Sequence, residues 1–256
     1  APSFTEGGSG IPFFEVERLP EFDQWGKVEV EPLRSIRRKV AQKMVASMVI
    51  VPHVAHMDEC DVTDLDDLRR QLNGSQDRVR YSLLPFIIKA CVGQLRRHPK
   101  VNASIDPHKS EIVYKKYYNV GFAADTPKGL LVPVIKDADR LSIAEIAENM
   151  LGLAERGREG KLDVQEMRGG TFTVTNLGAI GGTFVIPTIN YPEVAILGLG
   201  RAVERPVVKD GEIVVRKMLP MTIAYDHRLV DGADAARFLN DVIARLEDPT
   251  RLFVES

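Results

Sequence analysis

The sequence predicts an α/β fold, a sandwich with a mixed β-sheet and packed helices. From Glu31 onward, segments with apolar residues at helical spacing alternate with short apolar and β-branched runs that are typical of strands. Asp210-Gly211, between two apolar runs, is a strong signal for a two-residue turn and adds an antiparallel hairpin. With 256 residues, 44% of them hydrophobic, the chain can bury one large core or two small ones.

The first residues have a different composition. Residues 1–12 are rich in Gly, Ser and Pro, which is typical of a flexible linker. We therefore expect a linker or N-terminal extension over residues 1–28 and a core domain over residues 29–256. The chain also lacks an initial methionine, which suits the C-terminal portion of a longer protein, although ordinary N-terminal processing explains it as well.

Five segments have the spacing of amphipathic helices, and seven read as strands. In the first helix, apolar residues repeat every four positions, at Ile36, Val40, Met44 and Met48. Thr63 can cap the second. The expected helices span residues 32–48, 63–70, 83–97, 142–158 and 233–246. The expected strands span residues 51–62, 113–114, 117–124, 130–135, 171–175, 194–199 and 217–224, with a hairpin over 207–215.

Composition and charge exclude several classes of protein. The net charge of −2 argues against a nucleic-acid partner. No apolar run reaches the roughly 18 residues that a membrane span needs, and no secretory signal begins the chain. The two cysteines, Cys60 and Cys91, lack metal-type spacing and fit free thiols in a reducing compartment. We expect a cytoplasmic protein without a membrane partner and without a metal site.

The most informative motif lies near the C-terminus, where His227 precedes Asp231 by four residues and Gly232 follows at once. An apolar run before the motif predicts a strand, and helical spacing after it predicts a helix. His227 therefore lies at a strand-to-helix junction, where an imidazole can face a cleft and act as a general base near neutral pH. A structural histidine at the strand end is the alternative.

The Asp-His-Arg-x-x-Asp-Gly string resembles the active-site signature of the dihydrolipoamide acyltransferases, the core (E2) enzymes of the 2-oxo acid dehydrogenase complexes. It is more distantly similar to the signature of chloramphenicol acetyltransferase. Further segments match family motifs in the family's order: VPHVAHMD at 51–58, DTPKGLLVP at 125–133, GGTFTVTNLG at 169–178 and PEVAILG at 192–198. The resemblance covers roughly residues 30 to 256 and implies a chloramphenicol-acetyltransferase-like fold.

The resemblance also implies catalytic roles. His227 would be the base, and Thr175 would donate a hydrogen bond to the oxyanion. Thr171 and Thr173 lie on the same strand face, so spacing alone does not choose among the three hydroxyls. Asp231 would act structurally, paired with an arginine of the N-terminal helix: Arg34, Arg37 or Arg38. Asp226 and Arg228 receive no proton-transfer role.

Coenzyme A is the substrate that the resemblance implies, together with a lipoyl group carried on a separate domain. Aligned with the family, its contacts fall on Arg69, Ser82, Asp125, Thr175, Asn176 and Gly200. Arg69 suits phosphate, and Gly200 would let the backbone approach the ligand. Arg69 on a charged helix face and Ser82 as a helix cap are the simpler explanations for these two residues.

The sequence argues against three other functions: metal binding, nucleotide binding by a glycine-rich loop, and serine hydrolysis. His53 and His56 are three residues apart on a strand and point to opposite faces, so they form a poor metal pair. Gly198-Leu-Gly200 begins a nucleotide-binding pattern, but Val203 stands where its third glycine belongs. The Gly-x-Ser-x-Gly motif of serine hydrolases is absent.

Two functional hypotheses remain: an acyltransferase between a lipoyl arm and coenzyme A, and a mainly structural assembly core. Acetyl transfer to a free hydroxyl, as in chloramphenicol acetyltransferase, is a weaker third. Residues 12–26 resemble pyruvate-type chains and favour acetyl, whereas Gly181-Gly-Thr-Phe184 is similar to branched-chain members, and a succinyl-type enzyme stays open.

The resemblance also predicts assembly and partners. It implies trimers that join into a cubic or icosahedral core, with His227 of one chain and Thr175 of the next in each site. Lipoyl domains, and E1 and E3 components bound through other domains, would be the further partners. Leu252 and Phe253 in the apolar C-terminal run suggest a partner surface, with a tail folded onto its own core as the alternative.

Overall fold

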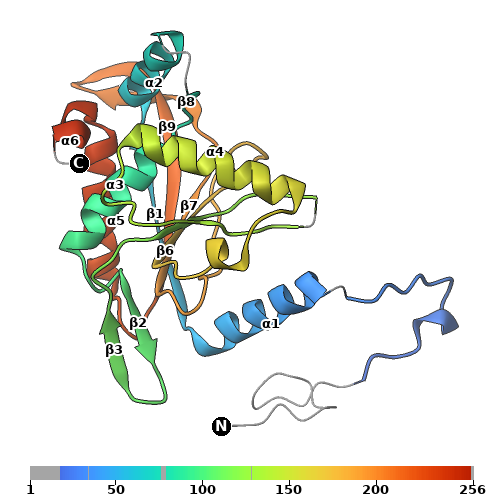
Figure 1. The fold of residues 1–256 in the computed structure, drawn as a ribbon. Helices are drawn as coiled ribbons and strands as arrows, with labels where there is room; N and C mark the ends of the chain where they lie inside the picture. The colour runs from blue at the N-terminus through green and yellow to red at the C-terminus, as the bar shows by residue number, and fades with distance from the viewer. Residues whose placement is uncertain (1–17, 34, 76–78, 128, 255–256) are drawn as a thin grey trace.

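A seven-stranded mixed sheet lies at the centre of the molecule (Figure 1). The structure is a computed structural model and describes residues 18–33, 35–75, 79–127 and 129–254. The strand order is β1-β9-β7-β6-β4-β5, with β8 paired to β9; β4, β6 and β7 are parallel and the other pairs antiparallel. The strands are β1 (His53–Asp61), β4 (Val120–Phe122), β5 (Val134–Ile135), β6 (Phe172–Asn176), β7 (Ala195–Leu199), β8 (Val203–Lys209) and β9 (Glu212–Asp226). The predicted α/β class is confirmed.

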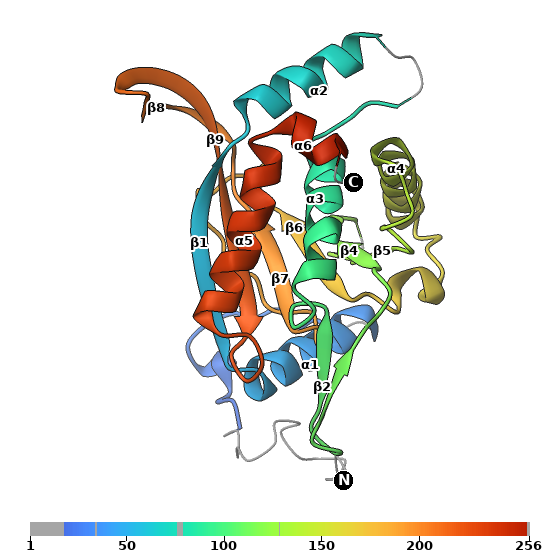
Figure 2. The ribbon, with the colours of Figure 1, turned by 90° about the vertical axis from the view of Figure 1, so that its left-hand side faces the viewer.

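Helices cover one face of this sheet and form the main core with it. In Figure 2, α3 and α5 run side by side across that face, with α4 beside them. Their buried residues join the apolar side chains of the strands in one cluster. The helices are α1 (Ser35–Ile50), α2 (Thr63–Ser75), α3 (Leu84–Arg97), α4 (Ile143–Glu159), α5 (Gly232–Leu246) and α6 (Pro249–Val254), with 3₁₀ turns η1 (Phe22–Gln24) and η2 (Val164–Met167).

Local sequence signals explain where several elements begin and end. Ser142 and Glu145 form a capping box that starts α4, and Gly160 ends this helix in the left-handed conformation. Asp231 caps α5. The predicted hairpin joins β8 to β9, with φ of 53° at Asp210 and 84° at Gly211, as a type I′ turn requires.

Two expectations about strands need correction. A hairpin of β2 (Ala103–Asp106) and β3 (Glu111–Tyr114) forms a separate sheet, and β2 was not predicted because its sequence, ASID, has no apolar run. The strand expected over residues 130–135 shortens to β5, with one isolated bridge between Ala124 and Leu131. Pro133 interrupts that run because it has no N–H to pair.

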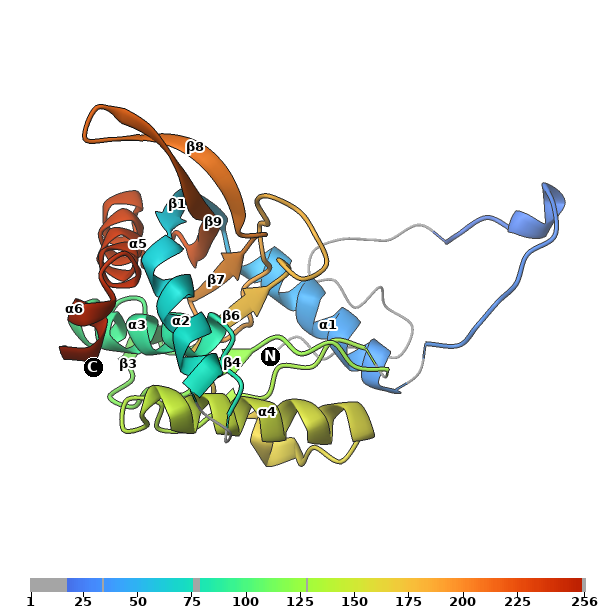
Figure 3. The same cartoon turned by 90° about the horizontal axis from the view of Figure 1, so that it is seen from above.

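The N-terminal helix is present, and two residues of its predicted apolar row are exposed. Val40 is 38% and Met48 58% exposed, whereas Ser47 is buried and donates a hydrogen bond to the Ile189 carbonyl at 2.6 Å. In Figure 3, α1 lies on the far side of the sheet from α3 and α5. The C-terminal residues are partly buried and partly exposed. Leu252 packs into the core of its own chain, whereas Phe253 and Val254 are exposed.

Both cysteines are buried free thiols, as the sequence predicted. Among the described residues, no helix is both long and apolar enough to cross a membrane.

Candidate active site

His227 lies at the junction between β9 and α5 that the sequence predicted, and its side chain is exposed. Its backbone N–H donates a hydrogen bond to the Pro52 carbonyl at 3.1 Å. Its ring lies 5.8 Å from the ring of Tyr225, centroid to centroid. The imidazole is therefore presented outward from a backbone that is held to the start of β1.

The residues on either side of His227 fix its loop. Asp226 is 1% exposed and accepts hydrogen bonds from the Arg228 backbone N–H at 3.0 Å and from its Nη2 at 2.6 Å. The Asp226 carbonyl also accepts from the N–H groups of Leu229 and Val230. No proton-transfer role was expected for Asp226 and Arg228, and their contacts hold the backbone of the loop that carries His227.

Asp231 does not face back toward His227 but caps α5. Its carboxylate accepts from the Asp234 N–H at 2.8 Å, and this bond, with the positive charge of Lys100, holds the pKa of Asp231 below its ordinary value. Among the described residues, no hydrogen bond or ion pair joins Asp231 to Arg37 or Arg38. Arg34 lies outside the described residues. The expected arginine partner is thus absent from the described part of this chain.

The structure distinguishes the three threonines of β6. The Thr171 hydroxyl donates to the Asn119 carbonyl at 3.1 Å, and the Thr173 hydroxyl to Glu193 Oε2 at 2.7 Å. Thr175 is half-buried, and no hydrogen bond to a described residue occupies its hydroxyl. Of the three, Thr175 is the one whose hydroxyl is available to a ligand.

His227 and Thr175 lie far apart within the chain. Thr175 is in register with Gly198 of β7, which is in register with Thr222 of β9. His227 follows Thr222 by five residues, which is about 17 Å along an extended strand. One chain alone cannot bring the imidazole and this hydroxyl to the same substrate atom.

Two cavities gather most of the predicted coenzyme A contacts at the carboxyl end of β6. Arg69, Ser82, Asn176 and Gly200 line a cavity of about 310 Å³. Ser82 also lines a neighbouring cavity of about 270 Å³, together with Asp125. Thr175 is absent from both linings, because successive strand residues point to opposite faces and Asn176 takes the cavity side.

Gly200 has a different reason to be glycine than the one expected. A Cβ at this position would overlap the carbonyl oxygen of Thr183, so the protein's own backbone occupies the space. The Arg201 N–H donates to the Gly182 carbonyl at 3.0 Å and holds the same loop. Gly200 lets this loop close over the end of β7.

Three charged residues that no sequence motif indicated also line the cavity of about 310 Å³: Asp66, Arg201 and Lys217. Lys217 Nζ lies 2.6 Å from Asp66 Oδ2, an ion pair between β9 and α2. These residues are 151 positions apart in the chain, and no local pattern links them.

A buried polar network lies at the opposite end of the sheet. Glu193 is 2% exposed and accepts hydrogen bonds from Thr173 and from Asn190 Nδ2 at 2.8 Å. Asn190 Oδ1 accepts in turn from Lys43 of α1 at 2.6 Å. Burial raises the pKa of Glu193 to about 7, against the lowering effect of these hydrogen bonds.

The two histidines of β1 do not form a metal site. His53 Nδ1 lies 2.8 Å from the Val51 carbonyl, and its Nε2 accepts from the Ile189 N–H at 3.1 Å, so protein groups engage both ring nitrogens. In the described part of the chain, no group of three His, Cys, Asp or Glu side chains is placed to hold a metal ion.

The fold defines the class of protein. A solved chloramphenicol acetyltransferase superposes with a TM-score of 0.53 at 15% identity, covering 77% of this chain and 89% of that one, so the two share a fold. A family model described as "2-oxoacid dehydrogenases acyltransferase (catalytic domain)" matches residues 26–254. The chain belongs to this family, which confirms the resemblance seen in its motifs.

Individual relatives are closer still. The acetyltransferase component of the Bacillus subtilis (strain 168) pyruvate dehydrogenase complex is 45% identical over 228 residues, 88% of this chain and 52% of the relative. The chain thus spans about half the length of this relative.

Two solved structures align over nearly the whole chain, each with a TM-score of 0.88 and covering 93% of this chain and 100% of the other. One, at 38% identity, is Azotobacter vinelandii dihydrolipoamide acetyltransferase, studied for the role of a serine, a histidine and an asparagine in its catalytic mechanism. The other, at 37%, is the cubic core of a pyruvate dehydrogenase multienzyme complex.

Proposed function

We propose that this domain transfers an acetyl group between a dihydrolipoyl arm and coenzyme A. One observation carries the proposal: residues that are far apart in the sequence, yet were assigned to coenzyme A by family motifs, line two adjoining cavities that share Ser82. A scaffold without activity has no need for such a gathering. The naming of the relatives as acetyltransferases supports acetyl over branched-chain or succinyl groups.

In the proposed reaction, His227 accepts the proton of the coenzyme A thiol as the sulfur attacks the thioester carbon. The Thr175 hydroxyl donates to the oxygen that becomes negative. The carbon–sulfur bond to the lipoyl arm then breaks, and the departing sulfur takes the proton from the imidazolium. In the Azotobacter enzyme, the histidine follows the serine by 52 residues and precedes the asparagine by 4. Thr175, His227 and Asp231 have the same two spacings.

The site requires two chains. The register displaces His227 from Thr175 by about 17 Å along the strand direction alone, so a neighbouring chain must supply one of the two groups. The exposed row of α1, with Val40 and Met48, and the exposed Trp25 before it suit burial against such a neighbour. In Figure 1, α1 and the described segment before it extend away from the sheet. A trimer with three shared sites is the assembly we propose.

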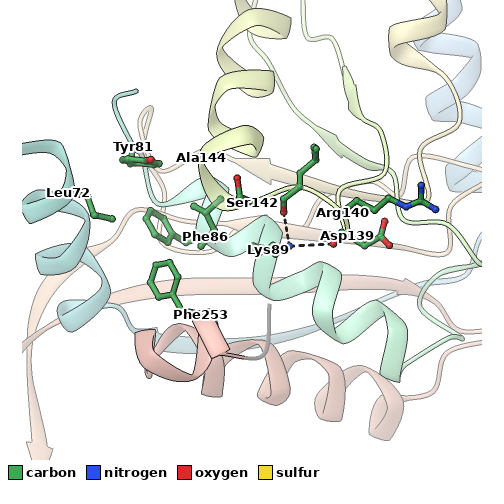
Figure 4. A pocket seen from close by; sticks show the side chains of 11 residues that line it. Leu72, Tyr81, Phe86, Lys89, Asp139, Arg140, Ser142, Ala144 and Phe253 are labelled. Carbon is green, nitrogen blue, oxygen red and sulfur yellow. Dashed lines mark hydrogen bonds between the residues drawn. The ribbon is translucent and has the colours of Figure 1, made fainter. Parts of the chain in front are cut away.

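A second surface suits contact between trimers. A cavity of about 540 Å³ lies between α3, α6 and the start of α4, with Phe86 and Phe253 among its apolar walls (Figure 4). Phe253 is 49% and Val254 80% exposed beside it. We propose a cubic core as the larger assembly, because the solved relative at 37% identity forms one. Lipoyl domains and the E1 and E3 components stay predicted partners, and cytoplasmic location stays a prediction.

The test is an acetyl-transfer assay with acetyl-CoA and dihydrolipoamide, run on the assembled protein. His227→Ala and Thr175→Ala are each expected to be inactive alone. Co-expressed in equal amounts, they should regain about a quarter of wild-type activity, because a quarter of the shared sites then combine two intact residues.

Each alternative has its own outcome. Activity only with branched-chain or succinyl donors would change the acyl group, and inactivity of a correctly assembled wild type would favour the structural core. A mixture as inactive as the single variants would contradict the shared site.

A further inference from the structure

The segment of residues 189–194, which leads into β7, is bonded to the two places that hold the backbone of His227. The carbonyl of its last residue accepts a hydrogen bond from the Asp226 N–H at 2.8 Å, one position before the histidine. The N–H of its first residue donates to His53 Nε2 at 3.1 Å, next to Pro52, whose carbonyl accepts from the His227 N–H. A shift of this segment would therefore move both backbone neighbours of His227.

Glu193 is the one charged residue of this segment, and its side chain is buried. Its Oε2 accepts a hydrogen bond from the Thr173 hydroxyl at 2.7 Å, and its Oε1 accepts from Asn190 Nδ2 at 2.8 Å. The Glu193 N–H also donates to the Asn190 carbonyl at 3.1 Å. Thr173 belongs to β6, the strand that carries Thr175. One buried carboxyl group thus ties the segment beside His227 to a central strand of the sheet.

These hydrogen bonds fit the ionised form of Glu193. A carboxylate only accepts, and both of its oxygens face donors here. Lys43 fixes the orientation of the Asn190 amide, because its Nζ donates to Asn190 Oδ1 at 2.6 Å and leaves Nδ2 toward Glu193. A proton on Oε1 would meet the Asn190 donor, and a proton on Oε2 would displace the one that Thr173 donates. Protonation at either oxygen therefore costs the network one hydrogen bond.

Two lysines act on Glu193 from other parts of the fold. Lys115 follows β3, and Lys43 lies on α1. Their positive charges favour the ionised carboxyl group, whereas burial opposes ionisation and raises the pKa of Glu193 to about 7. The groups that donate to the carboxyl, from Thr173 of β6 and from Asn190, are neutral. The network described above is therefore complete above neutral pH and incomplete below it.

We propose that Glu193 is a positioning residue, whose ionised carboxyl group fixes the segment of residues 189–194 and thereby the place of His227. This inference rests on the proposed function and adds a residue that does not touch the substrate. A structural role alone does not explain a carboxyl group, because an apolar side chain of similar size fills a core without the cost of burying a charge. The chain also leaves room for it: a Cβ at Gly170 would lie 2.8 Å from Glu193 Oε1.

The test is steady-state acetyl transfer by the assembled protein, with acetyl-CoA and dihydrolipoamide, between pH 5.5 and pH 8.5. Glu193→Gln puts a neutral amide of the same shape in place of the carboxyl group, and it can donate to Thr173 and accept from Asn190 as the protonated acid does. At pH 8.5 this variant should lower kcat by roughly 10-fold with KM for acetyl-CoA unchanged, because a misplaced base is felt in the transition state.

The loss should depend on pH. The ratio of the wild-type kcat to the kcat of Glu193→Gln should fall from roughly 10 at pH 8.5 to below about 2 at pH 5.5. Its midpoint should lie at about 7, where Glu193 of the wild type takes up its proton. His227 is present in both proteins, so its own protonation divides out of the ratio. Glu204→Gln makes the same exchange at an exposed site and should keep the ratio near 1 throughout.

Thr173→Val is the second variant, and it carries the test if Glu193→Gln fails to fold. Valine has nearly the shape of threonine but removes the donor to Glu193 Oε2. The ionised carboxyl group then loses a hydrogen bond, so its pKa should rise further. Thr173→Val should therefore lose activity at a higher pH than wild type does, a change that a loss of packing would not produce.

Three outcomes would overturn the inference. One is a kcat ratio for Glu193→Gln that is the same at every pH, which would leave the residue a structural role only. The second is a rise in KM without a fall in kcat, and the third is a normal kcat for the folded variant at pH 8.5. An equally active wild type and Glu193→Gln would keep the proposed function and refute only the positioning role. A correctly assembled wild type that transfers no acetyl group would refute both.

Discussion

Asp66 and Glu193 lie at opposite ends of the sheet and are both about 2% exposed, yet the pKa of Asp66 is lowered and that of Glu193 is raised. Burial by itself raises the pKa of Asp66, but hydrogen bonds from Lys217 and Arg69 outweigh it and leave the pKa below the ordinary value. Glu193 accepts its hydrogen bonds from neutral groups, Thr173 and Asn190, and burial raises its pKa to about 7.

The difference separates two kinds of site. At the cavity end, hydrogen bonds from Lys217 and Arg69 hold the pKa of Asp66 below its ordinary value, so this carboxyl group stays negative at neutral pH. At the His227 end, burial raises the pKa of Glu193 to about 7, so this carboxyl group changes protonation near neutral pH and makes this end sensitive to pH. Three predictions test this contrast.

The largest effect is expected at His227. His227→Ala should lower kcat by roughly 10²- to 10⁴-fold, because the attacking thiol loses its base. The fold and the assembly should be unchanged, since the Asp226–Arg228 contacts hold the loop without the imidazole. The measurement is acetyl transfer by the variant, with its size checked by analytical ultracentrifugation. Near-normal turnover by a correctly assembled variant would remove His227 as the base.

A slightly smaller effect is expected at Thr175, on the strand that leads to the cavities. Thr175→Ala should lower kcat by roughly 10²- to 10³-fold with little change in KM, because an oxyanion donor acts mainly in the transition state. Thr175→Ser keeps the hydroxyl and should be nearly silent, and Thr171→Ser serves as the control on the same strand face. A rise in KM alone would make Thr175 a ground-state contact.

The smallest effect concerns stability, measured by urea unfolding at pH 5 and pH 8. Burial raises the pKa of Glu193 from its ordinary value of 4.5 to about 7. The resulting contribution to stability is fully present below pH 4.5 and is lost as the pH rises through about 7. The stability of wild type relative to Glu193→Gln should therefore fall by about 2 kcal/mol from pH 5 to pH 8.

Asp66 should show no such change. Its depressed pKa contributes stability above the ordinary value of 3.8, which is lost only as pH falls below it. The difference between wild type and Asp66→Asn should thus be the same at pH 5 and pH 8. The exposed Glu204 gives the control, Glu204→Gln. If the stability difference between wild type and Glu193→Gln were the same at pH 5 and pH 8, the two buried carboxyl groups would not differ as proposed.

Local patterns predicted most elements of the fold because their causes are local. The Asp210-Gly211 turn, the helix that starts after Ser142 and the junction at His227 depend on residues within one turn or one strand. The β2 strand was missed because pairing with β3, rather than an apolar run of its own, makes it a strand. The sequence predicted the apolar row of α1 but not its exposure, because periodicity does not say which surface covers such a row.

For the site, the sequence by itself determined the candidates: an imidazole at a strand end, three hydroxyls on one strand face, and motifs that predict coenzyme A binding. Tertiary structure alone decided among the threonines, because only packing shows that Thr171 and Thr173 are engaged by Asn119 and Glu193. It also decided that Lys217 joins Asp66 and that His227 lies far from Thr175. These relations depend on strand register and on contacts between distant segments, for which a linear pattern holds no signal.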